Sequence, residues 1–121
     1  MTAQEFMVQL NAGRKDFDKL PDDFIVFYGT LDLRNSQIQS LGNLEKVLWG
    51  SLYLRNSQIT SLGKLKKVGR NLYLQDTQIQ SLDNLEKVGW NLYLSNTPLA
   101  EKYSIKQLEE MYPHFKGKFL I

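Results

Sequence analysis

The chain has 121 residues, no cysteine and a formal net charge of +2. This length favours a single domain, and the lack of cysteine excludes disulfides, thiolate nucleophiles and cysteine-based zinc sites. No apolar run reaches the roughly 18 residues of a membrane span, and the first residues lack the basic start and apolar stretch of a signal peptide. We therefore expect a cytoplasmic protein with no membrane partner.

The first 28 residues predict an N-terminal cap made of a helix and a degenerate repeat. Thr2 and Glu5 have the spacing of a capping box, and the apolar residues after them recur at helical intervals. Phe17, Leu20 and Val26 then stand where apolar residues of the next turn stand one period later. We expect residues 1–28 to close one end of a repeat structure, because an open end would expose core residues.

Residues 29–99 contain one apolar pattern that is repeated along the chain. Its first leucine recurs at positions 31, 52, 72 and 92, in steps of 21, 20 and 20 residues. The extra residue of the first step lies in the segment VLWGS, where the next repeat has VGRN. A short fixed period predicts a solenoid, because a single turn cannot bury its own apolar side and stacked turns share one core.

Each repeat predicts one short strand and an irregular return segment. In LYLRN, alternate residues point to opposite faces, so the leucines face the core and the tyrosine and arginine face outward. We expect strands near residues 30–34, 51–55, 71–75 and 91–95, stacked into one parallel sheet. The return segments contain glycine and are too short for a long helix, which predicts turns or a single 3₁₀ turn.

The repeated pattern resembles the leucine-rich repeat, in the short form found in bacteria and phages. Four successive copies follow L-x-L-x-x-[S/T]-x-I/L. A Ser or Thr occupies the place where that family usually has Asn, and the resemblance implies that these hydroxyls bond backbone groups of the loop. They are Ser36, Ser57, Thr77 and Thr97. The implied fold is a leucine-rich-repeat-like solenoid with a short parallel β-sheet on one face, turns or 3₁₀ on the other, and a short helical cap at each end.

Residues 100–121 predict a C-terminal cap made of a helix and a final strand. Ser104 and Gln107 repeat the capping-box spacing, apolar residues recur at helical intervals after them, and Pro113 ends the pattern. The last segment, GKFLI, echoes the GSLYL of the repeats. We therefore expect a last strand that extends the sheet.

The sequence contains no recognisable catalytic constellation. The only histidine, His114, has no metal-binding or catalytic partner near it in the sequence, and the glycines are spaced as bends instead of as a phosphate-binding loop. The adjacent acids Asp22 and Asp23 follow Pro21, which is typical of a turn. We expect a non-enzymatic protein with no cofactor, no metal and no small-molecule substrate.

The outward side of the predicted sheet is a candidate partner-binding face. Its columns contain three tyrosines and two arginines: Tyr53, Tyr73 and Tyr93, with Arg34 and Arg55. Tyrosine and arginine are enriched in binding hot spots. The tyrosines are equally explained as cross-strand packing, which stabilises a sheet by a few tenths to about 1 kcal/mol per pair. The sequence leaves both interpretations open.

Bulky residues break the repetition just before each strand, where the pattern otherwise favours small residues. They are Tyr28, Trp49, Arg70 and Trp90. The core does not require a tryptophan at this place. We expect these side chains either to fold over the solenoid edge or to anchor a partner.

A basic column recurs in the segments that precede the strands. The candidate nucleic-acid-binding residues are Lys46, Lys64, Lys66, Lys67 and Lys87. We expect them on the return side, away from the tyrosines. The neighbouring Glu45 and Glu86 favour a solvated face of mixed charge, whereas regularly spaced cations can also follow a nucleic-acid backbone.

The leading hypothesis is a solenoid that binds a protein or a ribonucleoprotein, because solenoids offer extended surfaces. The resemblance to bacterial and phage repeats implies an accessory protein of a phage or mobile element that inhibits a host protein, such as a CRISPR defence effector. One alternative is an RNA- or DNA-binding module that uses basic residues with stacking Tyr and Trp. Another is a structural or virion component.

Overall fold

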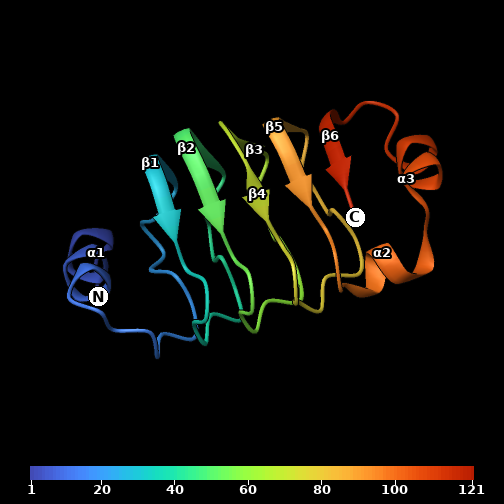
Figure 1. The fold of residues 1–121 in the computed structure, drawn as a ribbon. Coiled ribbons are helices and arrows are strands. Elements are labelled where there is room, and N and C mark those ends of the chain that lie inside the picture. Colours follow the sequence, from blue (N-terminus) through green and yellow to red (C-terminus); the bar gives the residue numbers. More distant parts are fainter.

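The computed structural model describes residues 1–121 as a parallel β-solenoid with short helices at both ends (Figure 1). The elements in chain order are α1 (Ala3–Asn11), β1 (Val26–Asp32), β2 (Lys46–Tyr53), β3 (Lys67–Val68), β4 (Leu72–Tyr73), β5 (Lys87–Tyr93), α2 (Pro98–Lys102), α3 (Ile105–Met111) and β6 (Lys116–Leu120). The predicted solenoid with a parallel sheet is confirmed, and the return segments are turns and bends.

Equivalent residues of successive repeats lie opposite one another in the sheet. Leu31 pairs with Leu52, Leu52 with Leu72, and Leu72 with Leu92, all in parallel register. Phe119 of β6 continues this row beside Leu92. The strands β3 and β4 are two halves of one turn, since both pair with β2 and with β5. The repeated leucines, isoleucines and valines form one continuous core.

Three strands begin earlier than the sequence predicts. β1, β2 and β5 begin at Val26, Lys46 and Lys87 instead of near 30, 51 and 91, whereas the strand predicted near 71 begins at Leu72 as β4 and is preceded by the additional strand β3 at Lys67. The cause is a close approach in the bend before the predicted strands. A Cβ on Gly50 would lie 2.3 Å from the carbonyl carbon of Gly29, so only glycine allows these backbones to pass so closely. The turns that contain β1, β2 and β5 therefore pass through this bend as one strand each, whereas the third turn is divided into β3 and β4.

The strands also end earlier than predicted, although backbone pairing continues beyond them. The Leu54 N–H donates to the Tyr73 carbonyl at 2.9 Å, and the Asn56 N–H donates to the Gln75 carbonyl at 3.0 Å. The chain then turns through a left-handed residue in each repeat, at Asn35, Asn56, Asp76 and Asn96. Asn and Asp tolerate this conformation better than other residues with a Cβ.

The hydroxyl column bonds the backbone as predicted. The hydroxyls of Ser36, Ser57, Thr77 and Thr97 each donate to the carbonyl three residues earlier, at 2.6 to 2.7 Å. All four residues are buried. Each buried hydroxyl is therefore paired with a backbone carbonyl at the start of the turn.

The N-terminal cap contains the predicted helix but its repeat is shifted by one residue. Thr2 and Glu5 form the capping box of α1. However, Val26 pairs with Lys46 and its side chain is 40% exposed, whereas Phe27 pairs with Val47. The prediction that Val26 is equivalent to Val47 is wrong, because the degenerate repeat is one residue longer than the spacing suggests.

The C-terminal cap contains the predicted helix and strand together with an additional short helix. Pro98 is the first residue of α2, where its missing N–H costs nothing. Ser104 and Gln107 form the capping box of α3. β6 lies parallel to β5 and completes the sheet, as expected from the GKFLI segment.

Candidate functional site

Three tyrosines form a stacked row on the outer side of the sheet, which we call the tyrosine ladder. Tyr53 and Tyr73 have ring centroids 4.4 Å apart and an interplanar angle of 5°. Tyr73 and Tyr93 have centroids 4.7 Å apart and an angle of 3°. Aromatic pairs contribute about 0.5–1.5 kcal/mol each beyond the area that they bury. The facing ring surfaces are therefore already used within the fold.

Tyr73, in the middle of the tyrosine ladder, is also held by hydrogen bonds. Asn71 Nδ2 donates to the Tyr73 hydroxyl at 3.1 Å, and Asn71 Oδ1 accepts from the Asn91 N–H at 3.0 Å. Burial raises the pKa of the Tyr73 phenol above its ordinary value. The tyrosine ladder is thus a rigid platform of ring edges and hydroxyls, with no gap into which a nucleic-acid base could insert.

Both predicted arginines lie beside the tyrosine ladder and are paired with carboxylates. Arg34 Nε is 3.1 Å from an oxygen of Asp32, and its guanidinium lies 5.3 Å from the ring centroid of Tyr53. Arg55 Nε is 3.2 Å from an oxygen of Asp76. The charge of each arginine is therefore partly compensated within the protein.

A polar depression of about 430 Å³ opens where the strands end. It is lined by Arg34, Asn35, Arg55, Asn56 and Asp76. A hydrogen bond from Asn96, and then one from Arg55, hold the pKa of the Asp76 carboxyl below its usual range. The Asn56 amide also donates to the Asn35 side chain at 3.0 Å. These side chains mainly bond one another.

The four bulky residues form two exposed pairs, and we call them together the crest. They were predicted just before the strands, but Tyr28, Trp49 and Trp90 lie within β1, β2 and β5, and only Arg70 lies outside a strand, between β3 and β4. The rings of Tyr28 and Trp49 have centroids 4.7 Å apart, and the Arg70 guanidinium lies 5.1 Å from the ring centroid of Trp90. Tyr28, Trp49 and Trp90 are 58%, 74% and 55% exposed. The structure thus keeps these side chains in solvent and does not fold them into the core.

Trp49 has a backbone conformation that is rare for a residue with a bulky side chain. Its φ is 68°, in the left-handed region. Gly29 pairs with Trp49 and Leu31 pairs with Leu52, so β2 contains one residue more than β1 between these points. This bulge is the extra residue noted in VLWGS. A left-handed conformation costs about 1–2 kcal/mol for a non-glycine residue, and a bulge redirects the side chain that it carries.

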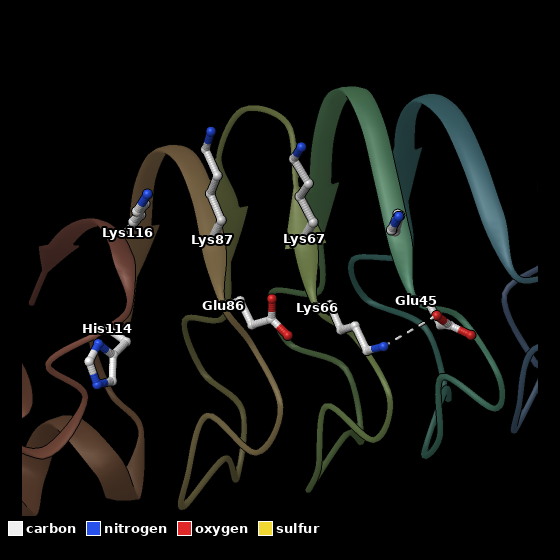
Figure 2. Close-up of a pocket in the computed structure, with 8 residues that line it drawn as sticks. Glu45, Lys66, Lys67, Glu86, Lys87, His114 and Lys116 are labelled. Atoms are coloured by element: carbon white, nitrogen blue, oxygen red, sulfur yellow. Dashed lines mark ion pairs between the residues drawn. The ribbon is translucent and has the colours of Figure 1, made fainter.

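Four lysines form a second row, which we call the lysine ladder. In the sheet register, Lys46 lies opposite Lys67, Lys67 opposite Lys87, and Lys87 opposite Lys116. Each is the first residue of its strand, so these lysines lie in the sheet and not in the return segments, where they were predicted. Figure 2 shows Lys67, Lys87 and Lys116 on neighbouring limbs of the solenoid, below the point at which each chain arches over.

None of the four ladder lysines forms an ion pair with a carboxylate. Like charges directly opposite each other in a sheet are destabilising. Two unit charges 4 Å apart in bulk water repel by about 1 kcal/mol, and less at larger separations. The repulsion within the lysine ladder is therefore offset only by the attraction of the nearby Glu45 and Glu86, which line the same depression.

The two other predicted basic residues are not part of the lysine ladder. Lys66 is 3.7 Å from Glu45 (Figure 2), and Lys64 donates to the Asn43 side chain at 2.8 Å. Lys66 still borders an open depression of about 470 Å³ beside the ladder, whereas Lys64 does not. The depression is lined by Glu45, Lys46, Lys66, Lys67, Glu86, Lys87, His114 and Lys116.

The sequence interpretation missed Lys116 and His114 as members of this surface. The signal was present in GKFLI, which was correctly predicted to be a strand. However, Lys87 and Leu92 are five positions apart in β5, and Lys116 and Phe119 are only three positions apart in β6. Because β6 is two residues shorter than β5, the repeat spacing does not predict that Lys116 is equivalent to Lys87.

Comparison with protein-family models, curated proteins and solved structures finds no match to this chain. No group of three or more His, Asp or Glu side chains is placed to hold a metal ion. The three helices are short, and none has the length and apolar content of a membrane span. The surfaces described above are therefore interpreted from their own chemistry.

Proposed function

We propose that this chain is a non-enzymatic, leucine-rich-repeat-type solenoid that binds another protein through the crest and the adjoining tyrosine ladder. The observation that supports this most is Trp49. This residue is 74% exposed and its backbone is in the left-handed region, although the repeat itself favours a small residue there. The strain in the Trp49 backbone is not offset by packing of its side chain in the core. Such strain is typical of a residue that contacts a partner.

The composition of the crest supports a protein partner. Trp, Tyr and Arg are the residues most enriched in binding hot spots, and all three occur in the crest. The tyrosine ladder beside it loses little side-chain entropy on binding, because Tyr53, Tyr73 and Tyr93 are already fixed by stacking. The proposed surface therefore combines exposed anchors with a rigid platform.

The partner class named by the family resemblance is a bacterial protein or ribonucleoprotein, such as a host defence effector. This remains a prediction that rests on the resemblance. For this reason the test uses a bacterial lysate, which contains partners of this class.

The test is capture from bacterial lysate with the tagged chain after nuclease treatment, followed by mass spectrometry. A Trp49→Ala/Trp90→Ala variant removes both tryptophans of the crest. Val8→Ala is the matched control, because Val8 is an exposed apolar residue of α1 at 65% exposure. We expect a defined protein to bind the parent and the control and to lose at least about tenfold in affinity for the double variant. Equal capture by all three chains would contradict the proposal.

A further inference from the structure

The lysine ladder is a second row of side chains that the fold itself does not explain, and three of its lysines stand three residues before a crest residue. We propose that it binds the phosphodiester backbone of single-stranded nucleic acid without reading the base sequence. The surface is formed by Lys46, Lys67, Lys87 and Lys116, which lie in register on four neighbouring strands. None of these four lysines belongs to the crest or to the tyrosine ladder, so the proposal rests on different residues from the protein-binding surface proposed above.

The geometry of the lysine ladder fits a linear ligand. Neighbouring strands lie about 4.8 Å apart, so four lysines extend over about 14 Å along the solenoid axis. The four ammonium groups have no carboxylate partner within the protein. A point anion would reach one or two of them, whereas a chain of phosphates can contact all four. A single row of cations can follow the backbone of one nucleic-acid strand, but not both backbones of a duplex.

The surroundings of the lysine ladder favour nucleic acid over an acidic protein. Eight residues line the depression beside the ladder, and none of them is hydrophobic. Protein partners are usually held by buried aromatic or aliphatic anchors, for which this surface offers no pocket. Binding to a phosphate backbone needs only cations, because the release of counterions supplies the affinity. An extended acidic peptide also presents only every second side chain to one surface.

Two glutamates are expected to limit the affinity of this surface for nucleic acid. Glu45 and Glu86 line the same depression, and Glu45 is paired with Lys66 (Figure 2). Their carboxylates repel phosphate and hold the affinity in the range of weak, non-specific binding. Neutralising them is therefore expected to strengthen nucleic-acid binding, which is the opposite of the effect of removing lysines.

The experiment measures fluorescence anisotropy with a labelled oligouridylate of about 12 nucleotides, within the site sizes of known single-strand binders. Four neutralised phosphates predict that log K falls against log salt with a slope of about −2.8. Lys67→Gln/Lys87→Gln should halve that slope and weaken binding at low salt by at least about tenfold. Glu45→Gln/Glu86→Gln should bind more tightly than the parent.

The matched control is Lys15→Gln/Lys64→Gln, which removes the same charge outside the lysine ladder. It should retain the parent slope and nearly the parent affinity. Equal losses in the two lysine double variants would overturn the proposal in favour of a general charge effect. A second probe, polyglutamate of equal charge, should bind more weakly, and equal or tighter binding would assign the surface to acidic proteins instead. Absence of oligouridylate binding at low salt would also overturn the proposal.

Discussion

Two rows of identical residues cross the same sheet, the tyrosine ladder and the lysine ladder. In the tyrosine ladder, neighbouring rings stack at 4.4 and 4.7 Å, so each copy of the residue stabilises the next. In the lysine ladder, lysines lie opposite one another in the sheet register and none forms an ion pair with a carboxylate, so each copy repels the next. Repetition of the sequence produces both rows, but only in the tyrosine ladder do neighbouring copies attract one another.

This contrast indicates how a repeated column bears on function. Duplication of a repeat copies every residue, so repetition alone does not show that a residue is used. A column whose members attract one another is sufficiently explained by the fold. A column whose members repel one another, or a residue held in a costly backbone conformation such as Trp49, needs a reason outside the fold.

The largest effect on stability is expected at the centre of the tyrosine ladder. Tyr73→Ala removes both stacked pairs and the bond from Asn71, and should lower the free energy of unfolding by about 2–4 kcal/mol. Urea denaturation measures this change. Tyr73→Phe keeps both ring contacts and should cost no more than about 1.5 kcal/mol. If the two substitutions cost the same, stacking does not stabilise the ladder.

The lysine ladder should respond in the opposite direction. Lys67→Gln/Lys87→Gln removes like-charge neighbours and should raise the free energy of unfolding by up to about 1 kcal/mol at low salt. The gain should disappear near 1 M salt, where the Debye length is about 3 Å. Thermal unfolding at several salt concentrations measures both effects. A loss of stability at low salt would show that these lysines are stabilised by contacts within the fold.

Substitution of Trp49 should affect partner binding strongly and the free energy of unfolding only slightly. Trp49→Gly relieves the left-handed conformation but loses the contact with Tyr28 and adds flexibility to the unfolded chain. These contributions are similar in size, so the free energy of unfolding should change by less than about 1 kcal/mol. Capture of the protein partner should nevertheless be lost. A large destabilisation in urea would instead make Trp49 a structural residue.

The smallest effect is expected at Asp76, whose charge is compensated beside the tyrosine ladder. Hydrogen bonds from Asn96 and Arg55 lower the pKa of this carboxyl below 3.8 in the folded state. Its contribution to stability is therefore present at pH values well above the pKa of the unfolded carboxyl and is lost progressively as the pH falls through the lower, folded pKa. The parent should exceed Asp76→Asn in stability at neutral pH, and the difference should shrink below pH 3.8. A difference independent of pH would contradict this assignment.

The solenoid could be predicted from the sequence because the apolar residues that form its core recur at a fixed spacing. Leucines at a fixed spacing must share one core, and the hydroxyls of Ser57 and Thr77 follow the same spacing. The close approach at Gly50 could not be predicted, because it depends on the position of the neighbouring turn. For that reason the strands were predicted to start too late, and the lysines were assigned to the return segments.

The candidate sites were predictable only in part, for the same reason. The tyrosines and the arginines lie in periodic positions, and the crest residues interrupt the repeated pattern at a recurring place, so these sets could be identified. The left-handed backbone of Trp49 results from one inserted residue, and the place of Lys116 results from a strand two residues shorter. Departures from the period carry the strongest functional signals here, and a periodic analysis detects them least well.

The most direct test of the contrast between the two ladders is a titration of the ¹⁵N-labelled chain with oligouridylate, followed by nuclear magnetic resonance. Shifts of the backbone amides should concentrate at the first residues of β2, β3, β5 and β6, around Lys46, Lys67, Lys87 and Lys116. The amides around the tyrosine ladder should remain unchanged. Shifts centred on Tyr53, Tyr73 and Tyr93, with none at the lysines, would contradict the account.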